Sequence, residues 1–345
     1  MFGRFMNNYY YGKSGKGDFR KEDLPETRMQ LFRDTLRTRL SALFRLNLLY
    51  MLVFLPMIIV MAMGYINILT NLQVVLAAQE GTLPEFLAEM QQEGEEPRTV
   101  TEEEMAEIAA TSPMDVIASS LYTTLLWLIP CIAITGPFTA GLCYVTRNWA
   151  RDEHAFIWSD FKDAVKANWK QALGLSAITS VLPILCYLGW QFYGGMAQQN
   201  MIMIVPQMLV VLVVIIWALA ITYMHPLVVT YELRFRDVLR NGFLLGVARL
   251  PMSVGIRLLH CVPCLIGFLL AYLWHPIYGM LILIAWYVLI GFSLSRFITA
   301  SYTNAVFDRF INPRIEGAVV NRGLRNPEDE DDEDDEDELQ EDRPE

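Results

Sequence analysis

Long runs without a charged side chain are the feature that most limits how this chain of 345 residues can fold. Asp, Glu, Lys and Arg are all absent from the 61 residues between Gln171 and Tyr231, and also from 46–79, 116–146 and 258–295. A water-soluble domain needs charged groups on its surface, whereas about 20 apolar residues in a helix cross the hydrocarbon core of a bilayer. We therefore expect an all-α, polytopic bundle of membrane helices.

The apolar runs divide into six predicted spans. They are 46–68, 116–142, 172–193, 202–225, 255–273 and 277–296. The longest run must hold two spans, because glycines and amides in "QFYGGMAQQN" interrupt its apolar pattern. The last two spans meet at Pro276, since proline can start a helix but cannot continue one. A five-span arrangement, with one weak span lost, is the alternative.

These spans define the predicted domains. We expect an N-terminal segment at 1–45 with an amphipathic helix, a membrane domain at 46–297 with an external loop at 70–115, a cytoplasmic helix at 298–326 and a disordered acidic tail at 327–345. Of the 27 Lys and Arg residues, Arg98 alone falls in a loop on the external side. Because cationic residues accumulate on the cytoplasmic side of membrane proteins, this bias predicts a multi-pass protein of the bacterial cytoplasmic membrane with both termini in the cytoplasm.

Three near-copies of one pattern, "FRDTLR", "FKDAVK" and "FRDVLR", precede the first, third and fifth spans. On a helix, each copy places apolar residues in one stripe and bases beside it, which suits a cytoplasmic headgroup layer of membrane lipids. The expected membrane-interface residues are Phe32, Arg33, Arg37, Phe161, Lys162, Lys166, Phe235, Arg236 and Arg240. We infer three parallel hairpin repeats, each with an amphipathic cytoplasmic helix. The alternative is that the flanks of membrane helices are simply basic and aromatic.

Prolines lie in or beside most of the predicted spans. A proline inside a helix frees a backbone carbonyl group, which can line a cavity, form a hinge or simply allow a kink that improves packing. The kink or hinge candidates are Pro56, Pro130, Gly136, Pro137, Pro183, Pro226 and Pro263. The segment "GPFTAG", from Gly136 to Gly141, also supplies small residues that permit close contact between helices.

The external loop and the C-terminus are both acidic. In the loop, "LPEFLAEM" and "TEEEMAEIAA" predict two short helices, the second with Thr101 as N-cap and Glu104 three residues later. The loop is either a cation or partner site, or a solvated pair of helices. Eleven acids in succession, Glu328 to Glu338, cannot bury enough apolar surface to fold. That tail either contacts the cytoplasmic basic helices, repels the anionic membrane or only aids solubility.

The spans contain few groups that carry chemistry. His260, Cys261 and Cys264 are a weak candidate for a metal or redox site, since all three could share one helix face, but cysteine within a span usually behaves as a small apolar residue. Motifs for nucleotide, nucleophile or zinc chemistry are not found in the sequence. We therefore expect no enzymatic activity, no catalytic residues and no cofactor. Nucleic-acid binding is not expected either, because membrane topology accounts for the basic residues.

Two stretches resemble a known family. "LNLLYMLVFLP" and "ITGPFTAGLCYVTRNWARDEHAFIWSDFKDAVKANWKQA", together with the aromatic and glycine-rich N-terminus, resemble the YesL family of bacterial integral membrane proteins. The resemblance implies a cytoplasmic-membrane location and, because such proteins often resemble accessory genes near carbohydrate transporters, a link to carbohydrate uptake. It implies no mechanism. The acidic tail and the large external loop depart from the family pattern.

Three functional classes are compatible with these features. The charge-free spans, basic cytoplasmic helices and acidic tail favour a non-enzymatic accessory or scaffolding component of a membrane complex, with a membrane-protein partner or a second copy of itself. The hairpins and prolines favour a transporter or permease for an uncharged solute, whose identity the sequence does not indicate. The third class is an intramembrane enzyme or redox protein.

Overall fold

The computed structural model describes residues 24–90 and 100–325, and within these ranges every regular element is a helix. The predicted all-α, polytopic fold is therefore confirmed. The acidic tail and the first 23 residues of the predicted N-terminal segment lie outside the described residues.

Six helices are long and apolar enough to cross a membrane. Five of them contain α2 (Arg28–Glu80), α5 (Pro113–Trp149), α6 (Ser159–Ala197), η2 (Met201–Met203) with α7 (Ile204–Thr230), and α9 (Leu250–Leu273). The sixth runs from Ile277 to Arg314 through α10 (Pro276–Trp286), the π-helical turn η3 (Tyr287–Gly291), α11 (Phe292–Phe310) and the 3-10 turn η4 (Asn312–Arg314). Each of the six predicted spans lies in one of these helices, so the five-span alternative is not supported.

The most apolar segments of these helices are mostly not covered by protein. In the most apolar 18-residue window of α5, as in that of α9, 6% of the residues are buried, and the value for α6, the highest of the six, is 28%. Large apolar side chains such as Trp127, Phe192 and Phe268 are each more than 60% exposed. Such surfaces require an apolar environment, which is what a bilayer provides.

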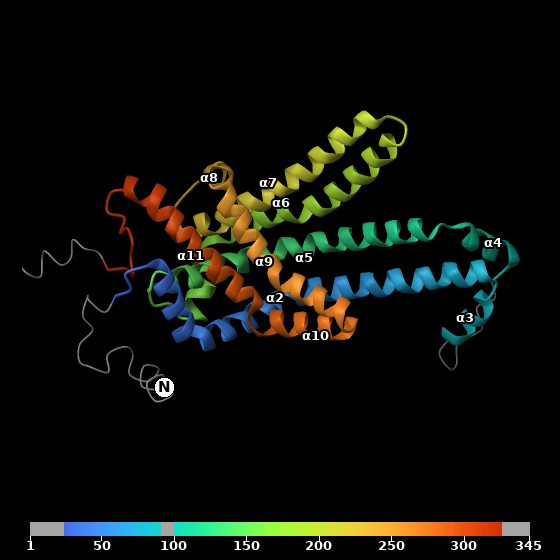
Figure 1. The fold of residues 1–345 in the computed structure, drawn as a ribbon, viewed down its shortest axis with the longest axis horizontal. Helices are drawn as coiled ribbons and strands as arrows, with labels where there is room; N and C mark the ends of the chain where they lie inside the picture. Colours follow the sequence, from blue (N-terminus) through green and yellow to red (C-terminus); the bar gives the residue numbers. More distant parts are fainter. Residues whose placement is uncertain (1–23, 91–99, 326–345) are drawn as a thin grey trace, which may run out of the picture. The chain divides into compact units, whose positions relative to one another are not determined.

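The chain divides into two compact units. Unit 1 comprises residues 1–52, 137–172 and 218–345, and unit 2 comprises 53–136 and 173–217. In unit 2, α2 and α5 run side by side, and Gly64 of α2 lies against Thr124 of α5 (Figure 1). The α6–α7 hairpin is held by a similar contact between Gly189 and Val210.

Two short helices of the loop between α2 and α5 also belong to unit 2. They are α3 (Leu83–Met90) and α4 (Glu102–Ala110), and both pack on a small core of Ala77, Ala78 and Leu83. Thr101 accepts a hydrogen bond from the Glu104 backbone, and the Glu104 carboxylate accepts one from the Thr101 backbone. The predicted capping box is therefore confirmed. The alternative of a cation or partner site in this loop stays a prediction.

Unit 1 has the larger buried core. Its fully buried large side chains include Trp149, Tyr223, Phe297 and Phe307, which come from α5, α7 and α11. The last hairpin pairs α9 with α10, and Gly267 and Gly279 let the two helices approach closely (Figure 1). The turn before α10 forms as predicted: His275 accepts a hydrogen bond from the Ile277 backbone, and Pro276 is the first helical residue.

Several sequence-based boundaries are wrong. The first two amphipathic segments are continuous with their spans, in α2 and α6, because Ala and Leu let each helix run on; the backbone of α2 departs from helical angles at Arg39. The third segment is a separate helix, α8 (Phe235–Ala248). The helix predicted at 298–326 ends at Phe310, because Pro313 removes a backbone donor. Residues 315–325 form turns.

The prolines do not break their helices. Pro56, Pro183, Pro226 and Pro263 lie inside α2, α6, α7 and α9, and the segment with Pro130, Gly136 and Pro137 lies inside α5. Their role as kinks or hinges stays a prediction. Among the described spans, the irregular backbone lies instead at Arg39 and at the π-helical turn η3, and no proline is present at either place.

Candidate functional site

The three copies of the repeated pattern share an exposed basic face. Their bases, Arg33, Arg37, Lys162, Lys166, Arg236 and Arg240, are all exposed. Two of their phenylalanines contact protein: Phe161 is 4% exposed, and the ring of Phe32 stacks on Phe297 at 5.1 Å between centroids. Contact of the exposed bases with membrane lipids stays a prediction, whereas the buried Phe161 packs on protein.

Glycine residues allow the second and third copies of the pattern, in α6 and α8, to pack closely against neighbouring helices. At Gly141 of α5, an added Cβ would lie 2.8 Å from the backbone oxygen of Phe161 and 2.8 Å from Val165 Cγ2. This is the close helix contact that "GPFTAG" predicts. In α8, Gly242 and Gly246 lie in the same way against Met224 and Ala220 of α7. The basic faces of α6 and α8 therefore belong to helices whose opposite faces pack against α5 and α7.

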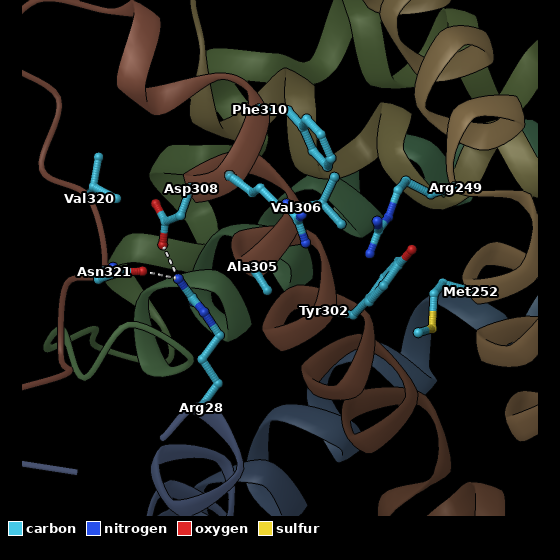
Figure 2. A pocket seen from close by; sticks show the side chains of 11 residues that line it. Arg28, Arg249, Met252, Tyr302, Ala305, Val306, Asp308, Phe310, Val320 and Asn321 are labelled. Atoms are coloured by element: carbon cyan, nitrogen blue, oxygen red, sulfur yellow. Dashed lines mark hydrogen bonds and ion pairs between the residues drawn. The ribbon is translucent and has the colours of Figure 1, made fainter. Parts of the chain in front are cut away.

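A buried carboxylate joins several chain segments in unit 1. Asp308 of α11, with a side chain 3% exposed, forms an ion pair with Arg28 at the start of α2 at 2.7 Å (Figure 2). Arg151, just after α5, lies 3.8 Å from its other oxygen. Asn312 donates a hydrogen bond to Asp308. We call these four residues the Asp308 cluster.

The Asp308 cluster also fixes the segment that follows α11. The Arg28 guanidinium donates to Asn321 Oδ1 at 2.6 Å, and Arg151 donates to the Val319 carbonyl oxygen at 3.3 Å. Gly323 has a φ of +82°, which glycine adopts without strain, and it packs on the Arg151 carbonyl group. These polar contacts therefore anchor the turns at 315–325, together with the buried side chain of Leu324.

Tyr231, directly after α7, completes this polar region. Its hydroxyl group donates a hydrogen bond to Asn312 Oδ1. Burial, together with the negative charge of Asp308, raises the pKa of Tyr231 to about 12. The phenol therefore stays neutral and keeps its donor hydrogen at physiological pH.

Asn47, which interrupts the first apolar run, is fully buried in unit 1. Its amide nitrogen donates to the carbonyl oxygens of Tyr287 and Val288, each at 2.8 Å. Its Oδ1 accepts a hydrogen bond from the Ser293 backbone at 3.0 Å. A π-helical turn leaves backbone groups without regular partners, so Asn47 satisfies the irregular backbone of η3.

His260, Cys261 and Cys264 do not come together as one site. His260 Nε2 lies 3.1 Å from the Ser295 carbonyl oxygen of α11, whereas Cys261 and Cys264 are exposed. Cys264 Sγ lies 3.4 Å from the Tyr287 hydroxyl group. No group of three potential metal ligands occurs among the described residues. A redox role of these three side chains stays a prediction.

Two groups of functional residues escaped sequence reasoning. Asp308 follows the last span in "NAVFDRFINP", and its partners lie up to 280 residues away, so no local pattern reveals the ion pair. Arg249, at the junction of α8 and α9, has a buried Nε atom without a hydrogen-bond partner. The sequence did contain a signal for each residue. Asp308 is a single acid in a mostly apolar helix, and Arg249 is a base two residues before Pro251 at the junction of two helices.

A known protein family resembles the middle of the chain. Residues 120–190 match the family model described as "Protein of unknown function, DUF624". The uncharacterized protein YesV of Bacillus subtilis (strain 168) is 26% identical over 146 residues, which cover 42% of this chain and 66% of YesV, just under two thirds of that relative. No solved structure matches this chain. The region matched by the family model includes the contact between Gly141 and Phe161.

Proposed function

We propose that this chain is a non-enzymatic accessory or scaffolding component of a membrane complex, in the bacterial cytoplasmic membrane and with both termini in the cytoplasm. The observation that carries the proposal is the surface at the start of α6. Lys162, Lys166 and Lys170 are exposed at four-residue intervals and so share one helix face. Among the described residues, none of the three forms an ion pair.

Aromatic side chains accompany these lysines. Phe156 and Trp158 are each 64% exposed, and Trp169 is 47% exposed. The Lys170 ammonium nitrogen lies 5.6 Å from the centroid of the Trp169 ring. Large exposed aromatic groups beside cations are typical of the central residues of protein interfaces. We call the three lysines and three aromatic residues the α6 surface.

The buried face of α6 supports a docking role. Phe161 is 4% and Ala164 6% exposed, so the helix is fixed in unit 1 while its basic face is free. A surface held rigidly before binding loses less conformational entropy when a partner binds. The resemblance to the YesL family is consistent with this role. The link to carbohydrate uptake rests on that resemblance alone and stays a prediction.

The test is purification of the tagged full-length protein from membranes of its own host, in a mild detergent. We expect a partner in stoichiometric amount with the wild type, and its loss from the double variant Lys162→Glu and Lys166→Glu. The matched control is Arg33→Glu with Arg37→Glu, which makes the same charge change in the first copy of the pattern. Recovery of the same amount of partner with the wild type and with the Lys162→Glu, Lys166→Glu variant would contradict the proposal.

A second experiment addresses the transporter class. Proteoliposomes that contain this chain alone are expected to show no uptake of neutral sugars or polyols above that of empty liposomes. Saturable uptake by the purified chain would replace the scaffold proposal with a permease.

A further inference from the structure

Two open cavities in unit 1 meet at Arg249 and Phe310. The first, which we call the arginine cavity, has a volume of about 560 Å³ and is lined by Arg249, Tyr302, Arg309 and Phe310, among others (Figure 2). The second, which we call the apolar cavity, has a volume of about 830 Å³. Apolar side chains such as Leu227, Leu244, Leu245 and Ile311 supply most of its lining, and Glu232 and Arg314 are charged residues of its lining.

The arginine cavity carries an excess of positive charge. The guanidinium carbon atoms of Arg249 and Arg309 each lie 5.6 Å from the centroid of the Phe310 ring. Neither arginine forms an ion pair within the part of the chain that the structure describes. The carboxylate in this cavity, Asp308, is already shared by Arg28 and Arg151. Two like charges beside one ring are favourable when an anion lies between them.

Donors near these arginines also lack partners. The Nε atom of Arg249 is buried without a hydrogen bond, and so is the Thr230 hydroxyl group of the apolar cavity. A buried donor without a partner costs free energy, which a ligand oxygen would recover. Arg249 lies where α8 ends and α9 begins, so the partial charges of the two helix ends oppose each other there and the arginine side chains supply the positive charge. Figure 2 shows the Arg249 guanidinium turned inward, toward Tyr302.

The apolar cavity indicates what the anion is attached to. Its walls at Leu244 and Leu245 belong to α8, and Leu244 and Val247 on this helix are 56% and 60% exposed. Such a helix lies in the boundary between headgroups and acyl chains. A free phosphate ion or an acidic peptide would leave the apolar cavity unfilled. A phospholipid can fill both cavities, the arginine cavity with its phosphate group and the apolar cavity with an acyl chain.

We propose that these adjoining cavities form a specific binding site for an anionic phospholipid. Its phosphate group lies between Arg249 and Arg309 and accepts hydrogen bonds from both, and one acyl chain occupies the apolar cavity. This site is distinct from the α6 surface, and its existence does not depend on the proposed accessory role.

The test measures lipid binding to the full-length protein in a non-ionic detergent, by native mass spectrometry. Dioleoyl phosphatidylglycerol is the probe, and phosphatidylcholine, whose choline group cancels the phosphate charge, is the comparison. We expect discrete binding of phosphatidylglycerol, and about tenfold weaker binding by Arg249→Gln, since a charge-assisted hydrogen bond is lost. Arg234→Gln, at an exposed base just before α8 and outside both cavities, is the control and should bind like the wild type.

A second variant tests the apolar cavity without touching the charge. Ala248 is exposed and lines this cavity, so Ala248→Trp should fill it and weaken lipid binding while the protein stays folded. Equal affinity of wild type and both variants would overturn the proposal. Equal binding of phosphatidylcholine would overturn it too. So would displacement of the lipid by inorganic phosphate, or by a synthetic peptide of residues 326–345 at matching concentration, since either shows an occupant without acyl chains.

Discussion

Ser293 donates its backbone N–H to the side-chain oxygen of Asn47 at 3.0 Å, across 246 positions of the sequence. The same Asn47 side chain donates to two carbonyl oxygens of the π-helical turn that connects α10 with α11. One buried amide therefore supplies three hydrogen bonds to an irregular backbone in an apolar region. The buried Asn47 side chain therefore supplies partners to the irregular backbone of η3.

Replacing Asn47 should destabilise the fold. Asn47→Leu removes three hydrogen bonds in a buried apolar site, and we expect a loss of about 2 kcal/mol in the free energy of unfolding. The measurement is unfolding in mixed micelles of increasing SDS content, followed by circular dichroism. Gln73→Leu is the control, because Gln73 is exposed. Equal stability of the two variants would show that the Asn47 contacts contribute nothing.

The close contact at Gly141 predicts that a single added methyl group destabilises the protein at this position but not at an open one. Gly141→Ala places Cβ 2.8 Å from the Phe161 backbone oxygen, so α5 and α6 must move apart, at a cost of about 1–3 kcal/mol. The matched change Gly255→Ala in α9 meets no atom within 4 Å and should be neutral or slightly stabilising. The midpoints of thermal aggregation in detergent compare the two. A Gly141→Ala protein as stable as Gly255→Ala would refute the contact.

The Asp308 cluster predicts that a nearly isosteric change is costly. Asp308→Asn leaves the guanidinium groups of Arg28 and Arg151 without their buried partner, and we expect a loss of about 3 kcal/mol. Asp163→Asn on the exposed face of α6 is the control and should change stability little. Limited proteolysis is the second readout, because the turns at 315–325 depend on Arg28 and Arg151. Unchanged cleavage there would contradict this dependence.

Tyr231 predicts a loss of stability at alkaline pH. Its pKa is raised from the ordinary value near 10 to about 12, chiefly by burial, so the folded state holds the phenol proton more tightly than the unfolded state. This contribution is complete below about pH 10 and is lost as the pH rises through about 12. The pH dependence of unfolding between these values should be shallower in Tyr231→Phe. Parallel curves for the variant and the wild type would be evidence against a raised pKa.

The sequence predicts what short-range physics determines. Apolar length places the spans, the spacing of Thr101 and Glu104 predicts the capping box, and Pro276 predicts the last turn. Small residues around Gly141 predict a close contact, although the partner, Phe161, becomes known only from the structure. Local rules cannot show that Asn47 satisfies η3, or that Asp308 binds Arg28, since both depend on segments more than 200 residues away.

The boundaries of the amphipathic segments fail for a related reason. A basic stripe beside an apolar one has the same spacing whether its helix ends before the span or continues into it. In α2 and α6 the helix continues, and only α8 is separate, because Arg249 and Pro251 stand at its end. The lipid site that we propose lies at this one break, where the residues of two helices and α11 converge.

The arrangement of six spans with both termini in the cytoplasm is tested most directly by a topology reporter. Alkaline phosphatase and green fluorescent protein, each fused in turn after Thr111 and after Glu345, report the side of the membrane on which each position lies. We predict phosphatase activity at Thr111 alone and fluorescence at Glu345 alone. Phosphatase activity at Glu345, or the same side for both positions, would contradict the account.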